Sequence, residues 1–237
     1  METLHQPRLL DQVRARCRVK HYSLRTEQAY THWVRRFILF HGKRHPREMG
    51  APEVEAFLTH LAVQENVAAS TQNQALAAIL FLYREVLGLE LPWLEGVTRA
   101  RKPPRLPVVL TREEVKALLA RLDGVYWLLA SLMYGSGLRL MEALRLRVKD
   151  VDLGRLEITV REGKGAKDRR TMLPVSLVEP MKRQRERVQA IHAQDTTEGL
   201  APVGLPHALE RKYPHAGREL AWQFLFPASQ PGLDPRS

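Results

Sequence analysis

The stretch Met133–Pro174, MYGSGLRLMEALRLRVKDVDLGRLEITVREGKGAKDRRTMLP, decides the fold of this chain. Its glycine-rich start, Gly135-Ser136-Gly137, predicts a turn that delivers Arg139 to the first turn of a short helix. Glu142 follows three residues later on the same helix face. Its carboxylate can therefore hold the Arg139 guanidinium in one orientation.

The second half of the stretch predicts a β-hairpin. A strand over Leu156–Val160 leads into Gly163-Lys164-Gly165, and a basic strand returns to Pro174. Glycines at the tip allow positive φ and close approach to another backbone. A fixed arginine near a mobile Lys164 suits a phosphate. The alternative is a buried ion pair on a core helix with Lys164 as a solvated tip, but both features in this order favour phosphate binding.

These residues resemble the tyrosine recombinases, or phage-type integrases, which break and rejoin DNA. The shared pattern is G-[ST]-G-L-R-x-x-E-A-L-x-L, then D-x-D, then G-K-G-x-K-x-R. On this resemblance the first catalytic arginine is Arg139, the hairpin lysine is Lys164, and Glu142 supports them. The returning strand adds Lys167 and Arg169 as candidate DNA contacts.

Composition is consistent with a nucleic-acid partner. The 237 residues carry 37 Lys and Arg against 26 Asp and Glu, a net charge of +11. Such a charge indicates a polyanion, with a merely soluble basic protein as the alternative. The single cysteine, Cys17, excludes a disulfide framework and fits a cytoplasmic protein. We expect no membrane span and no signal peptide.

Residues 1–97 predict only helices. Ser23 can cap a helix that runs to about Phe40, Pro52 suits the start of another, and Ser70 can cap a helix over Thr71–Leu87. A bundle of four or five helices follows. Thr71 and Gln72, at the start of the last helix, can meet phosphates or base edges, although an ordinary solvated helix start is equally consistent with them.

Residues 98–108 predict a linker, because the two adjacent prolines forbid helix. It is basic, and we predict DNA contacts there, with a plain spacer as the alternative: Arg99, Arg101, Lys102 and Arg105. Thr111 and Glu114 form a capping box that opens the second domain, and Ser176 and Glu179 suggest another before a helix over about 177–193.

The segment 195–228 resembles the insertion of the integron integrases. It carries L-P-x-A-L-x-x-K-Y-P-x-A over Leu205–Ala216 and W-x-F-x-F-P-[AS] over Trp222–Ala228. Integron integrases recombine gene-cassette sites that fold as single-stranded hairpins with extrahelical bases. His215, Trp222 and Phe224 are therefore candidate stacking platforms for those bases, in addition to a double-stranded attachment site. The alternative is a small core beneath a loop.

The resemblance implies an α+β fold that is mainly α. It predicts an N-terminal helical core-binding (SAM-like) domain over 1–97, the basic linker, and a partial catalytic domain over 109–237 with a small antiparallel sheet. The family also uses a second arginine in an H-x-L-R-H motif and a nucleophilic tyrosine, which we do not find. We therefore expect a C-terminally truncated chain that is inactive as given.

The implied chemistry needs no metal and no cofactor, because a phosphotyrosyl linkage conserves the energy for religation. Intact members of the family act as four protomers on DNA, joined by exchange of a C-terminal helix. Because we do not find that helix in this sequence, we do not expect these 237 residues to form the tetramer. Two alternatives stay open: a DNA-binding module without catalysis, and a fragment of a Xer-like or phage-like recombinase.

Overall fold

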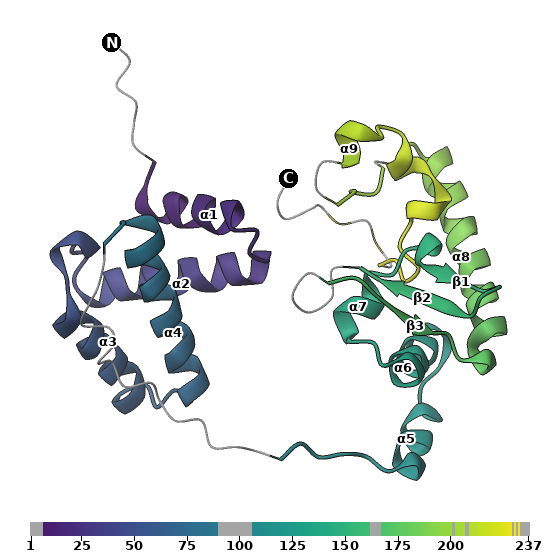
Figure 1. The fold of residues 1–237 in the computed structure, drawn as a ribbon, viewed down its shortest axis with the longest axis horizontal. Helices are drawn as coiled ribbons and strands as arrows, with labels where there is room; N and C mark the ends of the chain where they lie inside the picture. Colours follow the sequence, from purple (N-terminus) through teal and green to yellow (C-terminus); the bar gives the residue numbers. More distant parts are fainter. Residues whose placement is uncertain are drawn as a thin grey trace. The chain divides into compact units, whose positions relative to one another are not determined.

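The computed structural model describes residues 7–89, 106–161, 167–200, 202–206, 209–228, 230 and 232. The chain divides into two compact units, residues 1–107 and 108–237. Both units are mainly helical, and the described residues contain one small antiparallel sheet, in the second unit (Figure 1). This confirms the predicted α+β, mainly α architecture.

The described helices of the first unit pack around a common apolar core. They are α1 Leu9–Val19, α2 Leu24–Phe40, α3 Ala51–Val63 and α4 Ala69–Phe81, which continues as a π-helix over Leu82–Val86. Apolar side chains at helical spacing supply the core, in which the ring centroids of Phe37 and Phe57 lie 5.6 Å apart. Tyr83 anchors the core, because its buried hydroxyl donates to the Pro46 and Met49 carbonyls.

The predicted helix starts of this unit are right at one position and wrong at another. The Ser23 hydroxyl accepts the Thr26 N–H and caps α2, as expected. Ser70 caps nothing, because α4 begins earlier, with Ala68 as its N-cap residue. Thr71 and Gln72 thus lie within the first turn of α4 and not directly behind a cap.

The second unit combines a three-stranded sheet with surrounding helices. Its helices are α5 Arg112–Leu119, α6 Gly124–Ser136, α7 Leu140–Leu144, α8 Val178–Thr197 and α9 Leu209–Lys212. Its strands are β1 Val151–Asp152, β2 Glu157–Val160 and β3 Arg169–Met172, ordered β1-β2-β3 and antiparallel throughout. The register pairs Val160 with Arg169, so β2 and β3 form the predicted hairpin.

The apolar core of this unit lies where α6, the sheet and α8 meet, around Leu132, Ile158 and Met181. The capping box of Thr111 and Glu114 is present as predicted. The Ser176 box is wrong: residues 175–177 form a 3-10 turn, and α8 begins behind Leu177 without a side-chain cap.

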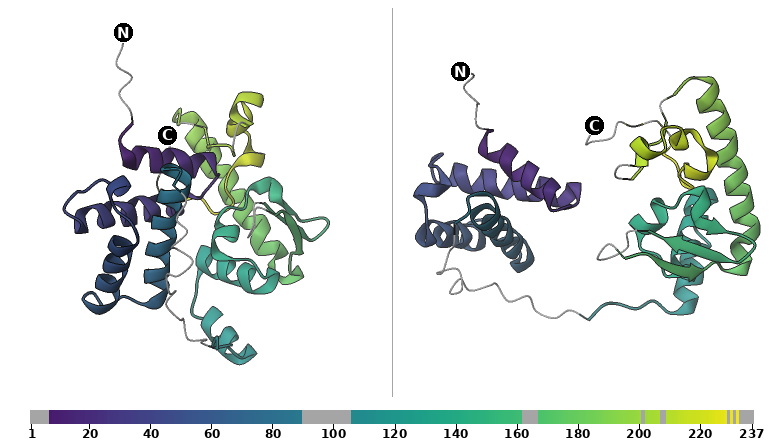
Figure 2. Two further views of the ribbon diagram at one scale, coloured as in Figure 1. Left: turned by 60° about the vertical axis from the view of Figure 1, so that its left-hand side comes forward. Right: turned by 45° about the horizontal axis from the view of Figure 1, so that its top comes forward.

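The chain that follows α8 turns back toward the start of the sheet. Figure 2 shows α8 along one side of this unit and the yellow segment after it returning over the other elements. Phe224 forms a backbone bridge with Arg147, and the Leu225 N–H donates to the Leu146 carbonyl at 2.7 Å. The end of the described chain is therefore built into the unit beside the turn that precedes β1.

Candidate nucleic-acid interface

The turn before Arg139 depends on one glycine. Helix α6 extends through Gly135 and Ser136, so the predicted three-residue turn narrows to Gly137. Gly137 has φ 64°, in the left-handed region that favours glycine, and its N–H donates to the Met133 carbonyl. The chain then places Arg139 as the N-cap residue of α7, one position before the helical turn where we expected it.

Gly135 has a different role from Gly137. A Cβ atom on Gly135 would lie 2.5 Å from Cγ of Pro174, the residue that ends the Met133–Pro174 stretch. No real Cβ packs that closely, so only glycine lets the last turn of α6 touch the chain just after β3. The side chain of Thr171 makes a second link there, since its hydroxyl donates to the Ser136 carbonyl at 2.9 Å.

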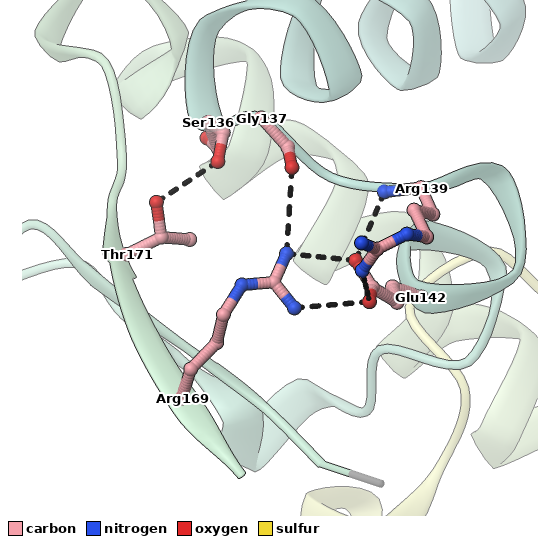
Figure 3. Close-up of polar contacts among 6 residues, drawn as sticks. All are labelled: Ser136, Gly137, Arg139, Glu142, Arg169 and Thr171. Carbon is pink, nitrogen blue, oxygen red and sulfur yellow. Dashed lines mark hydrogen bonds and ion pairs between the residues drawn. The ribbon is translucent and has the colours of Figure 1, made fainter. Parts of the chain in front are cut away.

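Glu142 is the centre of the site (Figure 3). Its side chain is only 7% exposed, and both carboxylate oxygens accept hydrogen bonds. The Arg139 backbone N–H donates to Oε2 at 2.9 Å, and Nη1 of the same residue donates to Oε1 at 2.7 Å. The predicted hold of Glu142 on the Arg139 guanidinium is present, and the same carboxylate also caps α7.

A second arginine, Arg169, holds the same carboxylate. Its Nη1 donates to Oε1 of Glu142 at 2.9 Å, and its Nη2 donates to Oε2 at 2.7 Å and to the Gly137 carbonyl at 3.3 Å (Figure 3). These charged donors, Arg169 first, lower the pKa of Glu142 to about 2, although burial opposes the shift. Glu142 is thus an anion near neutral pH, shared between two guanidinium groups.

Arg139 retains donors that can serve a ligand. Its side chain is 59% exposed, and of its guanidinium nitrogens only Nη1 has a partner within the described part of the chain. One edge of the guanidinium is therefore fixed by Glu142, while Nε and Nη2 face no acceptor among the described residues. A planar cation held by one edge and open at the other can bind a phosphate oxygen.

Of the other cations predicted for the site, some lie outside the described residues and some within them. Lys164, Arg99, Arg101, Lys102 and Arg105 lie outside the described residues. Lys167 is exposed just before β3, consistent with a DNA contact. Arg169, also predicted as a DNA contact, donates with its two Nη atoms to Glu142 and Gly137, and its contact with DNA stays a prediction.

The predicted contacts on α4 lie within the first unit. Thr71 and Gln72 are both half-buried in the first turn of that helix. Nε2 of Gln72 donates to the Leu58 carbonyl of α3 at 3.1 Å, so the Gln72 amide ties α3 to α4. This favours an internal role for Gln72, and its contact with DNA stays a prediction.

Segment 195–228 is fastened by Arg147, a residue that was not among the candidates predicted from the sequence. The Arg147 guanidinium is buried and donates to the Trp222 carbonyl at 2.6 Å and to the Gly204 carbonyl at 2.9 Å. It also lies 4.5 Å from the centroid of the Phe224 ring. Burial lowers the pKa of Arg147. The only sequence signal was its place between apolar residues, Leu146 and Val148.

The three candidate stacking rings differ in what already covers them. Phe224 packs against the Arg147 guanidinium, and the Lys149 ammonium lies over the half-buried Trp222 ring. Burial is the main cause that lowers the pKa of Lys149, and the positive charge of neighbouring Arg161 lowers it further. His215 is exposed at the start of a 3-10 turn. Of these rings, His215 is the most accessible, whereas Phe224 packs segment 195–228 against Arg147.

Among the described residues, no group of three or more His, Cys, Asp or Glu side chains could hold a metal ion. Within the same part of the chain, no helix is both long enough and apolar enough to span a bilayer.

A helical unit, followed by a mixed unit that presents an oriented arginine beside a β-hairpin, defines an integrase-type protein. The chain belongs to the phage integrase family. Residues 9–93 match the family's N-terminal SAM-like domain, and residues 108–223 match the phage integrase family itself.

Relatives support this assignment. The chain is 53% identical to an "Integrase/recombinase" of Escherichia coli and to one of Pseudomonas aeruginosa, each over 234 residues, which are 99% of this chain and 69% of the relative. It is 35% identical to the tyrosine recombinase XerA of Thermococcus kodakarensis over 160 residues, covering 66% of this chain and 54% of XerA.

A solved structure supports the fold. The integrase of transposon Tn1549, in complex with transposon right end DNA, matches with a TM-score of 0.55 at 15% identity, covering 76% of this chain and 65% of the integrase. The chain thus spans about two thirds of the length of these proteins.

Proposed function

We propose that this chain acts in site-specific DNA recombination of the tyrosine recombinase type, with integron gene-cassette sites as substrates. One observation carries the proposal: the guanidinium of Arg139 is fixed along one edge by a buried carboxylate and open along the other. Simple electrostatic binding does not need such an orientation. Charge stabilisation at a single reacting phosphodiester does.

In the proposed reaction, a tyrosine hydroxyl attacks the scissile phosphorus, a phosphotyrosyl bond forms, and the bond to the 5′-oxygen breaks. Arg139 stabilises the negative charge that develops on a non-bridging oxygen. Lys164 donates a proton to the leaving 5′-oxygen, which becomes a 5′-hydroxyl. The +11 net charge of the chain attracts the DNA backbone along which these groups work.

The proposed substrate rests on segment 195–228. Arg147 holds this segment at the Trp222 and Gly204 carbonyls, which gives its rings a defined position in the second unit. Exposed His215 and half-buried Trp222 then offer rings to an unpaired base. For Trp222, the Lys149 side chain would have to move off the ring, which its flexible stem allows.

The test is a gel-shift titration over a range of salt with the 237-residue chain. The probes are a folded cassette hairpin, the same hairpin with its unpaired bases removed, and a plain duplex of equal length. Preferential binding of the first hairpin supports cassette recognition. Equal binding of all three, with a steep salt dependence, would leave a general DNA-binding module.

A second test concerns cleavage by these 237 residues. We propose that on their own they bind DNA without cutting it, because these residues contain neither the H-x-L-R-H motif of the family's second catalytic arginine nor its nucleophilic tyrosine motif. A nicked suicide substrate, which traps covalent intermediates, should give no covalent protein–DNA adduct. An adduct would show that a tyrosine within the chain serves as nucleophile.

A further inference from the structure

Side chains on one face of strand β3 donate hydrogen bonds to backbone carbonyls at the C-terminal end of helix α6. Arg169 and Thr171 are two residues apart, so their side chains leave the strand on the same side. Arg169 donates to the Gly137 carbonyl at 3.3 Å, and Thr171 donates to the Ser136 carbonyl at 2.9 Å. A cation at a helix C-terminus also interacts favourably with the helix dipole. The returning strand of the hairpin is thereby docked at the turn that precedes Arg139.

The carboxylate of Glu142 is fully occupied. Each oxygen can accept about two hydrogen bonds, and each accepts one from Arg139 and one from Arg169. The two arginines differ in how many donors they commit. Arg169 uses both Nη atoms, whereas Arg139 uses only Nη1 of its guanidinium. Arg169 therefore fixes the plane of the carboxylate, and the carboxylate fixes Arg139.

We propose that Arg169 is a positioning residue for Arg139, acting through Glu142. This inference rests on the proposed function for what Arg139 does, but its structural part can be tested without DNA. The segment that carries Lys164 directly precedes β3 in the sequence, so Arg169 also joins the hairpin that bears one reactive cation to the helix that bears the other. Arg169 itself does not contact the substrate.

The competing role for Arg169 is a direct phosphate contact. The observed bonds disfavour this role, because Nη1 and Nη2 already serve Glu142 and the side chain is only 36% exposed. Arg170 provides a matched control. Arg170 follows Arg169 directly, so its side chain lies on the opposite face of β3. It is 70% exposed and pairs with Glu157 instead of Glu142. Replacing it removes the same charge one residue away without touching the carboxylate.

The first experiment records arginine side-chain NMR spectra of the 237-residue chain without DNA. A guanidinium held on a carboxylate rotates slowly and shows separate Nη resonances. In Arg169→Ala, and in Arg169→Lys, which keeps the charge but offers one ammonium, those resonances of Arg139 should merge. In Arg170→Ala they should stay separate. Unchanged Arg139 resonances in a folded Arg169 variant would overturn the inference and leave the proposed function intact.

The second experiment is a double-mutant cycle on duplex binding at fixed salt. We expect Arg139→Ala to weaken binding about tenfold. Arg169→Ala should weaken it by no more than that, and the double variant should bind like Arg139→Ala alone. Multiplying losses, about a hundredfold in the double variant, would show that Arg169 meets DNA itself and would overturn the inference. No DNA binding by the parent chain would instead refute the proposed function.

The conservative variant decides between positioning and plain charge. If Arg169 acts on DNA as a cation, Arg169→Lys should retain most of the affinity. If it positions Arg139, the lysine cannot hold both carboxylate oxygens, and Arg169→Lys should lose as much affinity as Arg169→Ala. Restored affinity in Arg169→Lys would contradict the positioning role. Thermal unfolding of each variant accompanies these measurements, so that only folded proteins are compared.

Discussion

Among the described residues, each unit of the molecule contains a buried glutamate that binds arginine. The two sites differ in how many arginine nitrogens the carboxylate leaves available to a ligand. In the first unit, Glu27 accepts from Nε of Arg18 at 3.2 Å and from Nη2 at 3.1 Å. In the second, Glu142 binds Arg139 through one guanidinium nitrogen and Arg169 through two. Both glutamates are less than a tenth exposed.

The difference shows which arginine can serve a ligand. Arg18 turns two of its three guanidinium nitrogens to one carboxylate, and that site joins α1 to α2. Glu142 is already held by Arg169, so it needs only one nitrogen of Arg139, and the rest of that guanidinium stays available. The Arg18–Glu27 contact is thus a tie between two helices, whereas Glu142, shared by Arg139 and Arg169, orients Arg139 for binding.

The largest expected effect comes from removing the shared carboxylate. Glu142→Ala leaves two guanidinium groups facing each other without an anion and removes the cap of α7. Breaking a buried ion pair by removing one partner costs about 3–5 kcal/mol. Because Arg139 and Arg169 are 59% and 36% exposed and water can solvate them, we expect a loss at the lower end, about 3 kcal/mol, for residues 108–237, measured by amide hydrogen exchange, together with loss of DNA binding.

Glu27→Ala is the comparison for that result. It should raise exchange only in residues 1–107 and cost less stability than Glu142→Ala, because Glu142→Ala also removes the cap of α7 and leaves two guanidinium groups facing each other. Loss of protection in the second unit by Glu27→Ala would contradict the independence of the two sites. So would a loss in the first unit by Glu142→Ala.

Acid should weaken the second site in a defined window. The pKa of Glu142 is lowered from 4.5 to about 2 by Arg169 and Arg139, so the charged carboxylate contributes stability that is full above about pH 4.5. This contribution is lost as the pH falls toward 2. In Glu142→Gln it is absent at every pH. The difference in free energy of unfolding between the parent and this variant should therefore shrink from pH 5 to pH 2.

Urea unfolding at several pH values, with hydrogen exchange to separate the units, measures that difference. Arg169→Ala sharpens the result. Since Arg169 is the first cause of the lowered pKa of Glu142, the loss in that variant should be smaller and should be complete at a higher pH than in the parent. A difference between parent and Glu142→Gln that does not vary with pH would contradict the assignment of the shift to this carboxylate.

Arg139 and Arg18 should differ in how much each contributes to DNA affinity. Arg139→Ala should weaken duplex binding about tenfold, which is about 1.5 kcal/mol and the lower end of the range for hydrogen bonds to charged groups, and reduce the salt slope by about 1. It should change stability little, because the side chain is 59% exposed. Arg18→Ala removes the same charge and should leave affinity unchanged. Equal losses of affinity would show that both arginines act only through net charge.

The sequence predicted the local parts of this comparison. Arg139 and Glu142 are three residues apart, and a helical spacing is enough to bring them together. The Thr111 cap and the β2–β3 hairpin are local in the same sense. Within the described residues these features could be read from the chain, because the partners lie within a turn of helix or a strand pair.

The missed parts depend on distant contacts. Arg169 lies 27 positions from Glu142, and alternation along β3 groups it with Thr171 without telling which layer that face meets. Arg147 reaches the Trp222 carbonyl across 75 positions. Gln72, predicted at a helix surface, instead donates to the Leu58 carbonyl. Sequence spacing names the polar residues, but tertiary packing decides which of them are used internally.

The smallest expected effect lies on the surface of the first unit. Glu85 pairs with Arg16 of α1 and with Lys20, the C-cap residue of α1, and all three side chains are about a quarter to a half exposed. Exposed pairs are screened by salt, with a Debye length of about 3 Å at 1 M. Glu85→Gln should thus change the melting temperature least of these variants, and not at all in 1 M salt. A loss that persists in 1 M salt would mean that Glu85, like Glu142, is a structural anion.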